Sequence, residues 1–112
     1  MKKITIPLID DGGVSEQVGY ESECAGLGVF KDREVGDWRL THIPSGLVVG
    51  IFRTRQVALR AAELHNEIDF DFTRSADDLR GDPESEEVMW ASIAACSIAM
   101  IEDQLGGKMY DA

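Results

Sequence analysis

The feature that most constrains the fold of this chain is a C-terminal stretch that carries almost no polar side chains. Between Val88 and Ile101, a run of 14 residues, only Ser92 and Ser97 have polar side chains. A helix that is apolar nearly all round has to be covered on more than one side. Because a membrane-spanning helix needs about 20 apolar residues, we predict that protein, and not lipid, covers this helix.

Sequence signals at both ends delimit the helix. Asp82 is the expected N-cap, and Pro83 takes the first helical position, where a missing N–H costs nothing. Acidic residues that complement the positive end of the helix dipole fill the first turns: Glu84, Glu86 and Glu87. Gly106-Gly107 ends the pattern. The predicted helix of about 22 residues is a rod of ~33 Å.

Two arrangements would cover such a helix. In the first, the helix lies at the centre of the core, between a sheet and a second helix. In the second, one face is left for a second copy or another partner, and a stripe of small residues would let that element approach closely: Ala91, Ala95 and Ala99. The fold prediction adopts the first arrangement, and a homodimer through this helix stays open as the second.

Four short segments have the composition or the alternation of apolar and polar residues that is typical of strands. They are Lys3–Ile9, Ala25–Lys31, Asp37–Ile43 and Leu47–Phe52. The last two flank the turn Pro44-Ser45-Gly46 and are predicted to pair as a hairpin. Residues 14–23 are polar and ambiguous, and the alternation in Asp69–Phe72 allows a short additional strand.

A shorter helix is predicted between the last of these strands and residue 68. Thr54 is its expected N-cap. The apolar residues that follow have the spacing of one helical face: Val57, Ala61, Leu64 and Ile68. Residues 73–81 are expected to form a loop. We therefore predict one α+β domain over residues 1–112, in which an antiparallel sheet of three or four strands packs against two helices and the long C-terminal helix is central.

Charge is divided unevenly along the chain. It carries 21 acidic and 11 basic residues, for a formal net charge of −10. Residues 38–62 contain no Asp or Glu, but four arginines lie there: Arg39, Arg53, Arg55 and Arg60. Acidic zones flank this window on both sides, at residues 10–37 and 69–87. Charge at this level indicates partners and solubility, and not fold.

The second acidic zone is the predicted partner-binding site. An acidic surface attracts basic partners and speeds their association. The residues expected to make the contact are Asp69, Asp71, Asp77, Asp78, Glu84, Glu86 and Glu87. The alternative is that these carboxylates are a solvated surface and the ordinary start of a helix.

The arginines offer a second candidate site. Arg53, Arg55 and Arg60 lie at a predicted helix start, where free N–H groups and the helix dipole attract phosphate. The favoured alternative is that these arginines pair with the excess carboxylates. A nucleic-acid surface would also carry more lysines and stacking aromatic residues, so direct nucleic-acid binding is not expected.

No pattern typical of catalysis or metal binding is present. His42, His65, Cys24 and Cys96 have none of the spacings that zinc sites use, so neither a metal nor another cofactor is expected. With two cysteines and no recognisable secretory signal, the chain is expected to be cytoplasmic, with reduced thiols and no membrane contact.

One segment carries a resemblance. The series Trp38-x-x-Thr41-His42-x-Pro44-Ser45-Gly46-Leu47, then a strand, Arg53-Thr54-Arg55 and an alanine-rich helix, resembles small uncharacterised proteins of bacteria, phages and mobile elements. It covers residues 37–70, and that family supplies no catalytic residues. In size, acidity and lack of catalytic motifs, the chain is also similar in kind to anti-CRISPR inhibitors of phages.

These observations predict a non-enzymatic, acidic protein-binding module. The function expected is that of a phage-encoded inhibitor that blocks a nucleic-acid-handling protein with a basic surface. Two alternatives stay open: a binder of nucleic acid or phosphate through Arg53, Arg55 and Arg60, and a dimeric accessory protein held together by the last helix.

Overall fold

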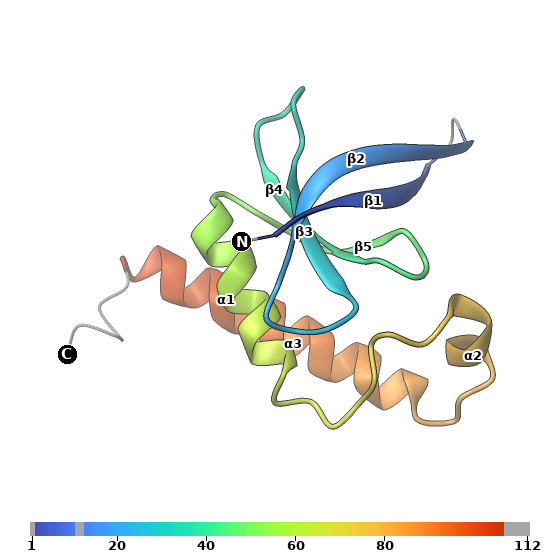
Figure 1. The fold of residues 1–112 in the computed structure, drawn as a ribbon. Coiled ribbons are helices and arrows are strands. Elements are labelled where there is room, and N and C mark those ends of the chain that lie inside the picture. Colours follow the sequence, from blue (N-terminus) through green and yellow to red (C-terminus); the bar gives the residue numbers. More distant parts are fainter. Residues whose placement is uncertain (1, 11–12, 107–112) are drawn as a thin grey trace.

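The part of the chain that the structure describes folds as a five-stranded antiparallel meander followed by three helices (Figure 1). A computed structural model describes residues 2–10 and 13–106. The strands are β1 (Lys3–Asp10), β2 (Gly13–Glu21), β3 (Leu27–Lys31), β4 (Trp38–His42) and β5 (Leu47–Phe52). The helices are α1 (Arg55–His65), α2 (Ala76–Arg80) and α3 (Ser85–Gln104).

The α+β class is confirmed, and the predicted number of strands is wrong by one. Each strand pairs with the next along the chain, in the order β1-β2-β3-β4-β5. The strand missing from the prediction is β2, which pairs with β1 from Lys3↔Tyr20 to Asp10↔Gly13. Its residues gave no apolar alternation because most of its described side chains face solvent. The predicted hairpin of β4 and β5 is present.

Helix α1 has the innermost position of the three helices. Thr54 is its N-cap, as predicted, and the Thr54 hydroxyl accepts a hydrogen bond from the Val57 N–H at 3.3 Å. Ala58, Ala61 and Ala62 are fully buried against β3, β4, β5 and α3. The small side chains let the helix lie close to the sheet. The helix ends at His65, three residues earlier than predicted.

The long C-terminal helix is also present, and it packs on α1 and on β5. It begins at Ser85 instead of Pro83, because Asp82 caps the preceding turn, where its Oδ1 accepts from the Glu84 N–H at 2.7 Å. Its buried residues form one narrow stripe: Ala95, Cys96, Ala99 and Glu102. Figure 1 shows α1 crossing in front of α3, with the sheet above both helices.

The segment between α1 and α3 differs from the prediction in two places. Residues 69–72 form no strand, and residues 76–80, predicted as loop, form the single-turn helix α2. Ser75 explains the helix, because its hydroxyl accepts from the Asp78 N–H at 3.2 Å. Among the described residues, no helix combines the length and the hydropathy needed to cross a bilayer.

Candidate protein-binding surface

An apolar hollow of about 580 Å³ lies between the β4–β5 turn, the segment 70–80 and the start of α3. Its apolar lining comes from Leu47, Val49, Phe70, Phe72, Leu79, Val88 and Met89. Arg80 and Glu86 also line it, next to His42, Ser45 and Ser92. A hollow of this kind, apolar inside and charged at its margin, fits a large apolar side chain presented by another protein.

Phe72 holds the segment 70–80 against the sheet. Its carbonyl oxygen accepts a hydrogen bond from His42 Nε2 at 2.8 Å. Gly26 lies directly beneath, with φ of +93°, and a Cβ there would come within 2.2 Å of the same carbonyl oxygen. Glycine at this position therefore permits both the backbone conformation and the close approach.

Two buried histidines form the inner wall around Phe72. Because a carbonyl can only accept, His42 Nε2 carries the proton, and His42 Nδ1 accepts from the Ser45 hydroxyl at 2.7 Å. His65 Nδ1 donates in the same way to the Ala61 carbonyl, and His65 Nε2 accepts from Ser92 at 2.7 Å. The His65 ring also packs edge-on against Phe72, with 5.6 Å between centroids.

The histidines are therefore structural in this geometry. Burial lowers the pKa of His42, and the bond to the Phe72 carbonyl opposes that shift. Burial likewise lowers the pKa of His65. Both rings stay neutral near pH 7, with both nitrogens occupied, so neither presents a free base to a substrate.

Five of the seven predicted contact acids are exposed and make no ion pair within residues 2–10 and 13–106. They are Asp69, Asp78, Glu84, Glu86 and Glu87. Residues 69–87 hold eight acids and two arginines, which gives a formal charge of −6. Asp78 lies on α2 and Glu86 on the first turn of α3, so both belong to elements that line the hollow.

The other predicted acids have partners inside the segment. Asp77 pairs with Arg80 at 2.8 Å across α2. The Asp71 carboxylate accepts from both the N–H and the hydroxyl of Thr73, and these bonds lower its pKa. Asp82, which the prediction treated as a cap, pairs closely with Arg74. The structure thus brings the acids to one region and leaves part of their charge unneutralised.

Two of the three arginines of the alternative site are held by the chain's own carboxylates. Arg53 makes a two-point contact with Asp103, at 2.8 and 3.2 Å, and Arg60 Nε donates to Glu102 at 3.2 Å. Arg55 lies over the Trp38 ring, 5.9 Å from its centroid. Two of the three guanidinium groups are therefore already paired with carboxylates of α3, which weakens the argument for phosphate binding there.

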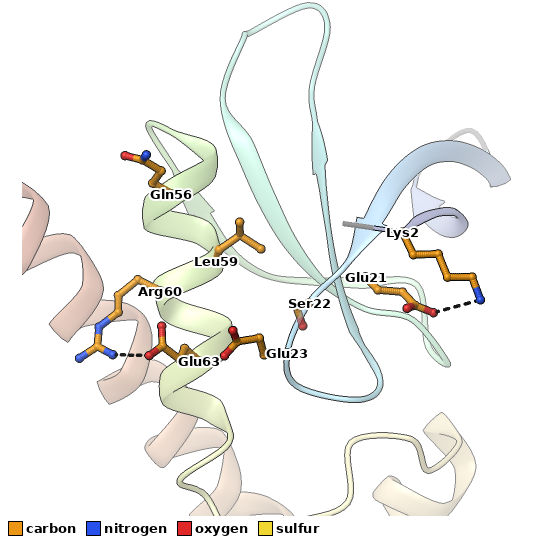
Figure 2. A pocket seen from close by; sticks show the side chains of 8 residues that line it. All are labelled: Lys2, Glu21, Ser22, Glu23, Gln56, Leu59, Arg60 and Glu63. Carbon is orange, nitrogen blue, oxygen red and sulfur yellow. Dashed lines mark hydrogen bonds and ion pairs between the residues drawn. The ribbon is translucent and has the colours of Figure 1, made fainter.

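A second depression of about 450 Å³ separates the start of β1 from α1 (Figure 2). Figure 2 shows ion pairs at opposite ends of it, Arg60 with Glu63 and Lys2 with Glu21. Its lining mixes both signs of charge and has a single large apolar side chain, Leu59. In the described part of the chain, no three His, Cys, Asp or Glu side chains are placed to hold a metal ion.

The two cysteines are buried and unpaired. Burial raises the pKa of Cys24, and it raises the pKa of Cys96 to about 11. Both thiols are therefore protonated and unreactive near pH 7.

Comparisons with protein-family models, with curated proteins and with solved structures found no match for this chain. The resemblance of residues 37–70 to small phage and mobile-element proteins therefore stays a prediction.

The sequence prediction missed the hollow. Local patterns allow a short strand at Phe70 and Phe72 and predict a loop at Leu79. The signal that was present is the occurrence of these three large apolar residues inside a strongly acidic segment. Their convergence with β5 and α3 depends on tertiary packing, which no local pattern reveals.

Proposed function

We propose that this chain is a non-enzymatic protein-binding module, and that its contact surface is the apolar hollow together with the acidic residues 69–87. The single observation that carries the proposal is the combination of the two in one place. The hollow would receive an apolar anchor from the partner, and the unpaired carboxylates would face a basic rim around that anchor.

The partner chemistry follows from this combination. Exposed carboxylates guide a basic protein to the surface, whereas the burial of an apolar side chain supplies most of the affinity. Strongly basic surfaces are typical of proteins that hold a nucleic-acid backbone. We therefore propose that the chain occupies such a surface and blocks it, as an inhibitor of the anti-CRISPR kind would.

The test uses the immobilised chain to capture proteins from a bacterial lysate at low salt. We expect one or a few basic proteins to be retained, to elute as the salt concentration rises, and to be displaced by excess oligonucleotide. Replacement of unpaired acids by Asp78→Lys, Glu84→Lys and Glu86→Lys should abolish retention. Leu79→Gln, which alters the hollow but not the charge, should weaken it about tenfold.

Matched controls separate this surface from general acidity. Glu16→Lys on β2 and Glu34→Lys in the β3–β4 loop change exposed acids outside the segment, and they should leave retention unchanged. Equal loss from the control and the test variants would contradict the proposal. Retention that survives the test variants, or a shift of free oligonucleotide by the chain that Arg55→Ala abolishes, would favour the arginine site instead.

A further inference from the structure

The outward half of α3 is an apolar surface that no described part of the chain covers. Its large side chains are between 40% and 61% exposed. They are Met89, Trp90, Ile93, Ile98, Met100, Ile101 and Leu105. Large apolar side chains gathered on one face in this way mark an interface, whereas scattered ones do not. This face lies outside the hollow, except for Met89 at its margin.

The middle of this face has a pattern that reads the same in both directions. Six exposed residues alternate in steps of three and one along α3: Trp90, Ile93, Ala94, Ser97, Ile98 and Ile101. At 100° per residue they all fall on one side of the helix. Large residues occupy both ends of the series and two small ones its centre. A contact between identical surfaces related by a twofold axis requires this kind of self-complementarity.

We propose that the occupant of this face is a second copy of the chain, packed with its α3 antiparallel to the first. Trp90 of one copy then lies beside Ile101 of the other, and Ile93 beside Ile98. Ala94 and Ser97 meet at the twofold axis, where their small side chains let the two helices approach closely.

The charges on α3 select the antiparallel orientation. Glu86 and Glu87 are exposed at its N-terminal end, whereas Gln104 and Leu105 are exposed at the other end. A parallel pair would set each glutamate beside its own copy, and like charges in contact are destabilising. In the antiparallel pair, Glu86 and Glu87 of one copy lie beside Gln104 and Leu105 of the other, so no acid meets an acid.

The size of the face agrees with a modest dimer. Half-exposed side chains with areas on the order of 200 Å² each give roughly 600 Å² per copy, near the lower end of standard interfaces. Two chains of charge −10 also repel each other, and salt screens that repulsion. The dimer therefore becomes tighter as salt increases, in contrast to the binding of a basic partner.

Sedimentation equilibrium of the full chain, from about 1 to 200 µM, tests the proposal. The expected mass rises from the 12.3 kDa of one chain toward twice that value, at lower concentration when salt is added. Trp90→Glu and Ile101→Glu should each keep the chain monomeric. Val18→Glu is the matched control, because Val18 on β2 is 62% exposed and Trp90 61%, and it should dimerise as the wild type does.

Thiol crosslinking tests the orientation independently of any loss of folding. A Glu86→Cys chain mixed with a Gln104→Cys chain should crosslink through a short bifunctional reagent. Neither chain should crosslink alone, because identical positions lie about 27 Å apart in the antiparallel pair. A single mass of 12.3 kDa at every concentration would overturn the proposal, as would a dimer that both glutamate variants preserve. Crosslinking of Glu86→Cys chains alone would overturn the antiparallel orientation.

Discussion

The two long helices, α1 and α3, both bury small side chains but expose different kinds of side chain to solvent. Helix α1 buries a face of small residues, Ala58, Ala61 and Ala62, and exposes charged residues such as Arg55 and Glu63. Helix α3 also buries small residues, Ala95 and Ala99, but turns its large apolar side chains outward. The rest of the chain covers the apolar face of α1, whereas it leaves the large apolar side chains of α3 exposed.

The difference teaches that apolar character alone does not place a helix at the centre of a core. The sheet offers one face for helices, and α1 takes it because its alanines permit close contact with three strands. Helix α3 packs mainly against α1 and β5. Its outward half stays exposed, and the proposal that a second copy covers this surface can be tested separately from the fold.

Substitution of a buried or an exposed alanine by leucine should give the largest difference in stability between the two helices. Ala61→Leu places a large side chain in a fully buried position of α1 and should lower the free energy of unfolding by about 1–3 kcal/mol. Ala94→Leu, on the exposed side of α3, should leave the stability of the dilute chain unchanged within about 0.5 kcal/mol. Urea denaturation at about 1 µM measures both values. Equal destabilisation would show that α3 is enclosed like α1.

The ion pair between the helices should have the next largest effect. Glu102 is 6% exposed and accepts from Arg60 across the α1–α3 contact, so Glu102→Gln should cost about 1–2 kcal/mol. Glu63 binds the same arginine at the same distance of 3.2 Å from an exposed position, and Glu63→Gln should change stability by less than about 0.5 kcal/mol. Equal losses of stability from Glu102→Gln and Glu63→Gln would contradict this prediction.

Acidification should weaken the contact between the helices through His65, which joins α1 to Ser92 of α3. Burial lowers the pKa of His42 and of His65 below the usual 6.5, so the unfolded chain binds protons first. The stability present above pH 6.5 is therefore lost as the pH falls through 6.5, by up to about 1.4 kcal/mol per pH unit for each histidine.

Chemical denaturation of the dilute chain between pH 7.5 and 5.5 measures this slope. His65→Gln and His42→Gln should each reduce it. The aspartates with lowered pKa, among them Asp82 and Asp103, start from 3.8 and so act only at lower pH. An unchanged slope in the double variant would show that the histidines are not responsible.

Sequence patterns predicted the parts of this fold that depend on local order. The cap at Thr54, the β4–β5 hairpin and the long C-terminal helix each follow from residues that are close in the chain. Strand β2 was not predicted because most of its described side chains face solvent, so its sequence shows no apolar alternation. The hollow was not predicted because Phe70, Phe72 and Leu79 form it together with residues of β5 and α3, which lie far away in sequence. Charge predicted where the acids gather and that the arginines pair with carboxylates, but not that the partners of Arg53 and Arg60 are Asp103 and Glu102.

The most direct test of the central claim is the accessibility of Trp90 at different concentrations. The chain has two tryptophans, so a Trp38→Phe variant reports on Trp90 alone, through quenching of its fluorescence by acrylamide. The account predicts strong quenching at about 1 µM, where the outward side of α3 is bare, and protection at about 200 µM, where a second copy covers it. Strong quenching at both concentrations would contradict the account.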